Sequence, residues 1–475
     1  MKNYKNINIR FIVLLSLGIA IISSCERDFS DDVQFATFNN NGDIFTDAPV
    51  GLTDEFFDSF DPAGPNPANP EGFGTDDNVA FMGTSSIRID VPAPDDPDGG
   101  FIGGIFLDRG DGRDLTGFDA LTFYIKGSTT ATVGEVGFGT DFEENKFAVI
   151  AQNIRLSTDW RKIVIPIPDP SKLVQERGMF FFSAGTQSTG GFGYTFWIDE
   201  LRFEKLGNIA QPSPAIFSGQ DISIPAVNGI EFLVTGLTQT FNLASGINQT
   251  VIAAPAYFDF TSSDNSVAIV NESGEIVVVG AGDTSITAQL ANVAASGSLN
   301  ISSNGVLPTA PLPAESAANV SSIFSNEFTN AVESNLEPTF GGSTTSIQLF
   351  PNNGDEVLVY TNNNFTGIVF NNTLDGTSRT TLNIDVYPLD ESTAVEVQIR
   401  DVGANQVLET NIFTGLPDGD DVDRRFLING LTPGQWTSVE IPLDGDLVAQ
   451  RNNLGALILA GGPNFIFDNI YFFTE

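Results

Sequence analysis

The sequence predicts an all-β protein in which three β-sandwich domains follow one another in a string. Short runs of alternating residues recur, as at 120–126, where Leu121, Phe123 and Ile125 are separated by more polar neighbours. Such alternation is the pattern of half-buried strands. Runs with helical periodicity are scarce, whereas turn residues are frequent, with 47 Gly and 25 Pro. Many short strands with frequent turns are typical of sandwiches and jelly rolls.

Residues 1–24 have the features of an export signal. Basic residues precede an uncharged apolar run at 11–22. This run is shorter than the roughly 20 apolar residues that span a bilayer, but it suits the core of a signal peptide. Residues 22–25, Ile-Ser-Ser-Cys, resemble the lipobox that bacterial lipoprotein signal peptidase cuts. Cys25 is therefore the expected lipid-attachment site. The alternative is an ordinary secretory signal with an unrelated cysteine.

Residues 25–32 form a short acidic tether. The order Glu-Arg-Asp-Phe-Ser-Asp-Asp after Cys25 resembles the surface-export signal of Bacteroidota lipoproteins. This resemblance implies that a lipid anchor holds the protein to the outer membrane, on the face turned to the cell exterior.

The composition excludes several classes of function. A length of 475 residues predicts roughly three domains. The net charge of −39 repels phosphate backbones, so we expect no nucleic-acid partner. It argues more mildly against sulfated or uronate-rich polymers. The absence of histidine removes the usual base of hydrolytic triads and the commonest metal ligand. A single cysteine excludes a disulfide within the chain and a structural zinc site, whereas calcium, which takes oxygen ligands, remains open.

An internal repeat organises the chain. Three pairs of similar segments occur in the same order: 120–125 and 381–386, 160–167 and 436–443, and 196–203 and 465–472. In both members of the second pair, a tryptophan lies at the same distance from a proline. This order predicts two copies of one fold, at 33–206 and 316–475.

The middle segment, 207–305, differs from both copies. Pro212 and Pro214 open it, and a Pro-rich stretch at 306–315 follows it, as expected of semi-rigid linkers. A turn and strand at 263–270 and a longer Gly- and Thr-containing run at 274–288 resemble the bacterial Ig-like domain, group two. Such modules usually act as spacers, which implies that this segment separates the outer domains.

The two outer domains resemble carbohydrate-binding jelly rolls of Bacteroidota. The first looks like the amino-terminal domain of lipoproteins from polysaccharide-utilisation loci, on the segments 99–106, 112–126, 136–141, 165–173 and 194–201. The last looks like a glycan-binding domain attached to laminarin-degrading enzymes, on 320–328, 360–367 and 467–471. The resemblance implies a non-catalytic surface protein that captures polysaccharide, with a neutral β-glucan such as laminarin as the expected ligand. It also implies an outer-membrane glycan transporter complex as a partner.

Aromatic side chains are the candidate sugar-binding groups, because a ring can cover the C–H face of a pyranose. In the last domain the resemblance points to Phe340, Phe365 and Tyr387, with Tyr360 and Asn364 nearby. Positions matching Phe340 and Tyr387 are commonly Trp in that family, and the position of Phe365 is commonly Tyr. Alternation along 382–387 independently places Tyr387 outward. The alternative for Phe340 and Phe365 is a place in the core.

In the first domain the candidates come from a polar, aromatic, turn-like stretch at 141–147. These candidates are Phe142, Asn145 and Phe147. The alternative for the whole stretch is a solvated loop without a ligand.

Two aspartates occupy matching places in the closing segments of the repeats. Asp199 and Asp468 lie within apolar runs, where a charge needs a partner or a metal. In this fold class a calcium ion often ties the first strand to the last. Asp199, Asp468 and Asn326, near the start of the last domain, are therefore candidate ligands of a structural calcium. The alternative is an aspartate bonded to backbone amides.

Two other functions compete with glycan binding. An adhesion or structural role suits the Ig-like module and the acidic surface. A glycoside hydrolase would need two carboxylates about 5 to 9 Å apart, which composition alone does not exclude. However, the Glu-x-Asp-x-x-Glu signature of laminarinases is absent, and no segment remains for a separate catalytic domain. We therefore expect neither catalysis nor a required cofactor.

Overall fold

The computed structural model describes residues 38–52, 56–63, 67–390, 394–410, 415–462 and 464–474. Within these ranges the regular structure consists of strands β1 to β33 and short 3-10 helices η1 to η6, which confirms the all-β prediction. None of these helices has the length and apolarity needed to cross a membrane. The predicted signal peptide (1–24) and the whole of the predicted tether (25–32), including Cys25, lie outside the described residues. The 3-10 helices are η1 (Pro170–Lys172), η2 (Gln187–Thr189), η3 (Phe217–Gly219), η4 (Pro255–Tyr257), η5 (Ala317–Asn319) and η6 (Gly445–Val448).

The first domain is a sandwich of two sheets. One sheet has the strand order β3-β4-β11-β6-β9, and β1 also pairs with β11. Its strands are β1 (Asp43–Phe45), β3 (Phe73–Asp76), β4 (Ser86–Val91), β6 (Ala120–Gly127), β9 (Arg161–Pro166) and β11 (Tyr194–Glu204).

The second sheet of the first domain continues into the middle segment. It has eight strands in the order β12-β15-β16-β8-β7-β10-β5-β2. The first domain contributes β2 (Asp58–Ser59), β5 (Ile102–Leu107), β7 (Thr132–Phe138), β8 (Val149–Arg155) and β10 (Gly178–Ala184). The middle segment contributes β12 (Ala210–Ala215), β15 (Thr238–Asn242) and β16 (Asn248–Ala253).

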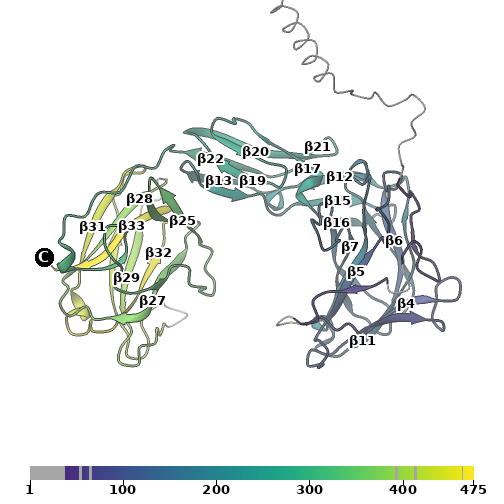
Figure 1. Ribbon diagram of the computed structural model, residues 1–475, viewed down its shortest axis with the longest axis horizontal. Coiled ribbons are helices and arrows are strands. Elements are labelled where there is room, and N and C mark those ends of the chain that lie inside the picture. The colour runs from purple at the N-terminus through teal and green to yellow at the C-terminus, as the bar shows by residue number, and fades with distance from the viewer. Residues whose placement is uncertain are drawn as a thin grey trace, which may run out of the picture.

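The rest of the middle segment forms two smaller sheets. One has the order β13-β22-β20-β17, with β21 on β20, and the other has the order β14-β19-β18. The strands are β13 (Asp221–Ala226), β14 (Glu231–Leu233), β17 (Phe258–Ser262), β18 (Ala268–Val270), β19 (Glu275–Val278), β20 (Gly282–Leu290), β21 (Val293–Ala294) and β22 (Ser298–Ser303). Figure 1 shows this segment between the two outer domains.

The last domain repeats the sheet order of the first. Its sheets are β25-β26-β33-β28-β31, with β23 on β33, and β24-β27-β32-β29-β30. Each strand therefore has a counterpart in the first domain, in the same place and the same order. The bounds are β23 (Val320–Phe324), β24 (Ser334–Asn335), β25 (Ser346–Asn352), β26 (Asp355–Thr361), β27 (Phe365–Leu374), β28 (Thr381–Pro388), β29 (Val395–Asp401), β30 (Val422–Ile428), β31 (Thr437–Pro442), β32 (Leu454–Ala460) and β33 (Phe465–Phe473).

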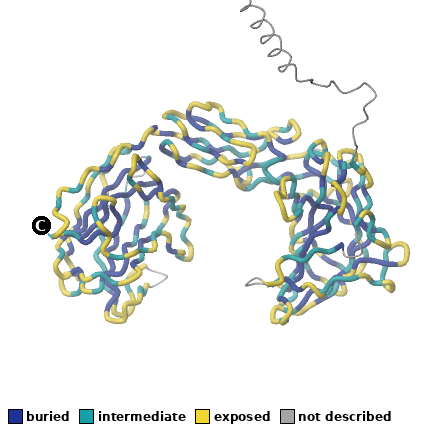
Figure 2. Tube along the Cα trace, in the orientation of Figure 1, coloured by how far each residue is buried: buried dark blue, intermediate teal, exposed yellow. Residues whose placement is uncertain are grey.

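Three buried clusters hold the chain together. One is shared by the first domain and the middle segment, and one fills the last domain. Figure 2 shows the buried positions along the inside of each sandwich. The third cluster lies where the middle segment meets the last domain and includes Ile230, Phe350 and Tyr387. The middle segment is thus packed against both neighbours through apolar contacts.

Candidate functional site

The second sheet of the first domain has an outward side that is lined by glycine and aromatic residues. Phe106, Phe180 and Phe182 belong to the core, so the alternation of strands puts Ile105 and Phe181 on the other side. Phe181 pairs with Ile105 and with Gly137. We name this outward side of β5, β10, β7 and β8 the first outer face.

Glycines make the first outer face flat enough for rings to lie on it. A Cβ atom added at Gly137 would come within 2.5 Å of the Phe181 ring, and one at Gly103 within 2.8 Å of the Phe60 ring. Each ring therefore occupies the space that another residue's side chain would fill. Phe181 is only 3% exposed, so Phe60, which is half-buried, is the more accessible of these two rings.

Phe142 adds an exposed ring to the same face. Its centroid lies 5.9 Å from that of Phe60 in an edge-on arrangement, and the side chain is 51% exposed. The backbone at Phe142 has a φ of 60°, a left-handed conformation that a bulky residue rarely adopts and that carries strain of about 1–3 kcal/mol. The loop nevertheless holds it, because the Asp141 carboxylate accepts hydrogen bonds from the backbone N–H groups of Glu143 and Asn145 at 3.0 and 3.2 Å.

Polar groups flank the rings. Ser183 pairs with Gly103 and with Glu135, and Glu135 pairs with Gln152. The Gln152 amide donates to the Glu135 carboxylate at 2.9 Å. An amide, a carboxylate and a hydroxyl beside exposed rings are the groups that bond sugar hydroxyls, whereas the rings cover sugar C–H faces.

The last domain carries an equivalent surface. We name the outward side of β27, β32, β29 and β30 the second outer face. Like the first outer face, it has a glycine beneath a ring, here Gly367. The Phe340 ring lies on it, 3.0 Å from a Cβ atom added at Gly367. Phe365, at the start of β27, is half-buried. A buried amide, Gln398, also faces this side, and its Oε1 atom has no hydrogen-bond partner.

The candidate residues of the last domain fall into two groups. Phe340, Asn364 and Phe365 come together at the start of β27, where the Asn364 side chain holds the neighbouring loop by accepting from the Thr344 N–H at 2.8 Å and donating to the Gly342 carbonyl at 2.9 Å. Tyr360 and Tyr387 lie apart from this group and are 0% and 1% exposed.

The burial of the two tyrosines has different causes. Tyr360 is in the core of the last domain, 5.3 Å from Phe467 between ring centroids. Tyr387 faces away from that core, as alternation predicts, but the middle segment covers it, and Trp436 lies 5.4 Å away. Neither ring is therefore part of the surface that we propose for binding.

The candidate residues of the first domain have three separate roles. Phe142 is the exposed ring of the first outer face. Asn145 holds the loop, because its side-chain oxygen accepts from the Asp141 N–H at 2.9 Å. Phe147 packs against Tyr257 of the middle segment, with ring centroids 5.4 Å apart, and its carbonyl accepts from the Tyr257 hydroxyl at 3.1 Å. Phe60 is a further aromatic residue of the first outer face that the sequence did not predict, and its one signal in the sequence was Gly103, over which its ring lies.

Asp199 is a buried aspartate satisfied by backbone amides. Its carboxylate accepts from the N–H groups of Phe81, Met82 and Glu200 at 2.7, 3.1 and 2.7 Å. The bulge that follows places Glu200 at a φ of 51°. Three donors satisfy the charge without a cation, so these contacts do not favour calcium at Asp199.

Asp468 occupies the matching place in the last domain but has fewer partners. One oxygen accepts from the Asn469 N–H at 2.6 Å, whereas Oδ2 is buried without a partner. Asp385 pairs with it across the strands. Burial raises the pKa of Asp468 to about 7, and the nearby carboxylates of Asp355 and Asp385 add to the shift. Asn326 is solvent-exposed, two residues beyond β23. The Asp468 site fits a cation, because an unpartnered carboxylate oxygen lies among other carboxylates.

Comparison with known proteins bears on the first domain. The family model described as carbohydrate binding domain 30 matches residues 54–205, which contain the whole first outer face. The match supports a carbohydrate-binding β-sandwich. A search among curated proteins finds no match for the chain.

Several solved structures are similar to parts of the chain. A family 30 carbohydrate-binding module of a cellulosomal cellulase of Clostridium thermocellum is 18% identical, covers 35% of this chain and 99% of its own, and gives a TM-score of 0.26. A family 11 module of another cellulosomal cellulase of that organism is 16% identical, with coverages of 34% and 97% and a TM-score of 0.23. A tandem of two family 22 modules from Paenibacillus barcinonensis is 10% identical, with coverages of 93% and 100% and a TM-score of 0.21.

Proposed function

We propose that this chain is a non-catalytic glycan-binding protein whose outer faces hold a neutral polysaccharide. The observation that carries the proposal is the family-model match over residues 54–205, because these residues form the aromatic first outer face. The second outer face repeats the arrangement of a ring on a glycine. Two weak sites on one chain strengthen binding to a polymer, since the second contact is made at high local concentration.

The ligand that we propose is a neutral β-glucan such as laminarin. The net charge of −39 disfavours anionic polymers, and rings beside hydroxyl and amide groups suit an uncharged sugar chain. Affinity electrophoresis of protein beginning after Cys25 tests the proposal, in gels that contain laminarin, mixed-linkage β-glucan or hydroxyethylcellulose. We expect retardation by at least one polymer, with no release of reducing ends. Migration unchanged by every polymer would contradict glycan binding, and release of reducing ends would contradict the non-catalytic role.

We further propose that Cys25 carries a lipid that anchors the chain to the outer membrane, on the exterior side. There the protein would pass captured glycan to a transporter complex. The lipobox-like residues and the acidic tether support this proposal. Replacing Cys25 by Ala is expected to move the protein from the membrane fraction to the soluble fraction. Membrane association unchanged in this variant would contradict the anchor.

We propose calcium binding at Asp468, in the last domain. The pKa of Asp468 is raised from 3.8 to about 7, so the folded chain holds a proton that the unfolded chain releases near pH 4. The contribution of this group to stability therefore falls as the pH rises from about 4 to about 7. Calcium would bind the ionised carboxylate and offset this loss at high pH.

A comparison of the chain with its Asp468→Asn variant tests this site. Without calcium, the variant is expected to be more stable at pH 8 by as much as about 4 kcal/mol, and equally stable at pH 4. Calcium is expected to raise the melting temperature of the unaltered chain at pH 8 and to leave the variant unchanged. A melting temperature that calcium does not alter, at either pH, would rule out the metal.

A further inference from the structure

The first outer face does not end at the boundary of the first domain. Strand β8 pairs with β16 of the middle segment, with Ile150 opposite Ile252 and Val149 opposite Ala253. Val149 and Ala253 belong to the buried cluster, so Ile150 and Ile252 share the outward side. One row of paired residues runs across the junction through Phe181, Gly137, Ile150, Ile252, Thr238 and Ala215.

The last domain provides an internal comparison. Its second sheet ends at β30, which is the counterpart of β8. The same fold therefore occurs twice in this chain, and in the described structure only the first copy is extended by strands of the middle segment. The extension is a property of the junction and is not a general consequence of the jelly-roll topology.

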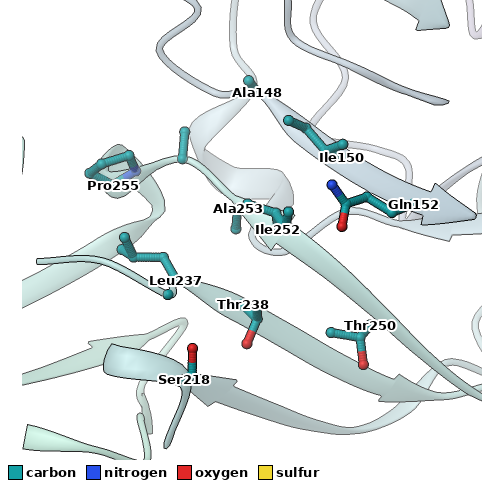
Figure 3. A pocket seen from close by; sticks show the side chains of 12 residues that line it. Ala148, Ile150, Gln152, Ser218, Leu237, Thr238, Thr250, Ile252, Ala253 and Pro255 are labelled. Carbon is teal, nitrogen blue, oxygen red and sulfur yellow. The ribbon is translucent and has the colours of Figure 1, made fainter. Parts of the chain in front are cut away.

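A hollow of about 670 Å³ lies on the extended surface, across the junction. Figure 3 shows its lining: Ile150 and Gln152 on β8, Ile252 and Thr250 on β16, and Thr238 on β15. None of its 12 lining residues is charged, although the chain has 60 acidic residues. Apolar side chains beside hydroxyls and an amide suit the C–H faces and hydroxyls of a neutral sugar.

The junction that carries the hollow is fixed before any ligand binds. The Ala254 N–H donates to the Ala148 carbonyl at 2.9 Å, and the fully buried Tyr257 packs against Phe147. A surface that is already ordered loses little conformational entropy when it binds a chain.

We propose that a polysaccharide bound to the first outer face continues over β16 and β15, so that the middle segment is part of the binding site. This inference rests on the proposed glycan-binding function. At about 4.8 Å between neighbouring strands, the five strands of the first domain span about 19 Å, and β16, β15 and β12 add about 14 Å. Long glycans therefore reach the middle segment, whereas a trisaccharide is held by the first domain alone.

Arginine at Ile252 tests the extension. Ile252 is 37% exposed, so a long side chain can be accommodated at the surface while it obstructs the hollow. Two ligands are used: the polymer that retards the chain most in affinity electrophoresis, and the trisaccharide cut from that polymer. The affinity for each is measured by titration calorimetry. We expect Ile252→Arg to weaken binding of the polymer by about five- to tenfold and to leave binding of the trisaccharide unchanged.

Two further variants make the result decisive. Ile269→Arg is the matched control, because Ile269 is 46% exposed on β18, in a different sheet of the same segment. It is expected to change neither affinity. Thr238→Arg obstructs the hollow from β15 and should repeat the effect of Ile252→Arg, which separates obstruction from a local folding defect.

The outcomes distinguish the two proposals. If the unaltered chain binds the polymer and both hollow variants bind it equally well, the extension is wrong and the glycan-binding function stands. If the unaltered chain binds no polymer, the function and the extension fail together. Equal weakening of polymer and trisaccharide would also contradict the extension, since it would place the hollow within the site for short sugars.

Discussion

Alanine at both Phe60 and Phe142 is expected to weaken glycan binding to the chain about 30- to 100-fold. Each ring that covers a sugar contributes about 1–1.5 kcal/mol through buried apolar area and ring contact. Loss of two rings then amounts to about 2–3 kcal/mol, and each 1.4 kcal/mol is tenfold in affinity. Titration of the unaltered chain and the double variant with the tightest-binding polymer measures the effect.

The control for this experiment is Phe192→Ala. Phe192 is 77% exposed and precedes β11, in the opposite sheet of the first domain, so its loss should leave binding unchanged. The single variant Phe142→Ala separates binding from stability, since its ring is half exposed, and a fall of several-fold in affinity is expected without a change in melting temperature. Full affinity in the double variant would show that the sugar lies elsewhere.

The aromatic positions illustrate what the sequence can and cannot predict. Alternation correctly places Tyr387 on the outward side of its strand. It does not show that the middle segment packs over that side and leaves the ring 1% exposed. Contacts between domains depend on surfaces that are distant in the sequence, and no local period encodes them.

In the first domain, too, the sequence predicts the strands but not the contacts between them. The prediction of strands and of a sandwich is confirmed, because periodicity is a local property. The placement of the Phe60 ring over Gly103 requires knowing that two strands lie side by side. Likewise, nothing local to 248–253 indicates that this strand extends the sheet of another domain.

The buried aspartates show that matching sequence positions can differ in chemistry. Both belong to closing strands at the same bulge, and the sequence predicts the same role for both. Asp199 receives three backbone donors, whereas Asp468 receives one and faces other carboxylates. The difference lies in the loop at 81–82, between β3 and β4, because the matching strands β25 and β26 of the last domain are joined by Asn353 and Gly354 alone. Only the contacts in the folded protein distinguish an aspartate that is satisfied by backbone amides from one that is a candidate cation ligand.

Arg113→Met is expected to destabilise the first domain by about 3–5 kcal/mol. Arg113 is fully buried, its Nε lies 3.0 Å from the Asp108 carboxylate, and its other nitrogens donate to the carbonyls of Asn41, Asp43 and Val50 at 3.0, 2.6 and 2.6 Å. Removing the cation leaves a buried carboxylate and three carbonyls without their donor, which is the costly way to break such a pair. A fall of roughly 10 °C in the first thermal transition is the corresponding calorimetric result.

The matched control for Arg113 is Arg88→Met. Arg88 pairs with Asp90 on the surface, where the two side chains are 45% and 48% exposed, and such pairs contribute less than about 1 kcal/mol. If the melting temperature of Arg113→Met falls as little as that of the control, the buried network is not needed for stability.

Because Asp108 directly follows β5, the network also fixes the end of a strand of the first outer face. Arg113 itself is fully buried and does not reach that face, so we expect the folded Arg113→Met variant to bind glycan with full affinity, and binding to be lost only as the protein unfolds. A variant that stays folded but has lost binding would show instead that the network shapes the face itself.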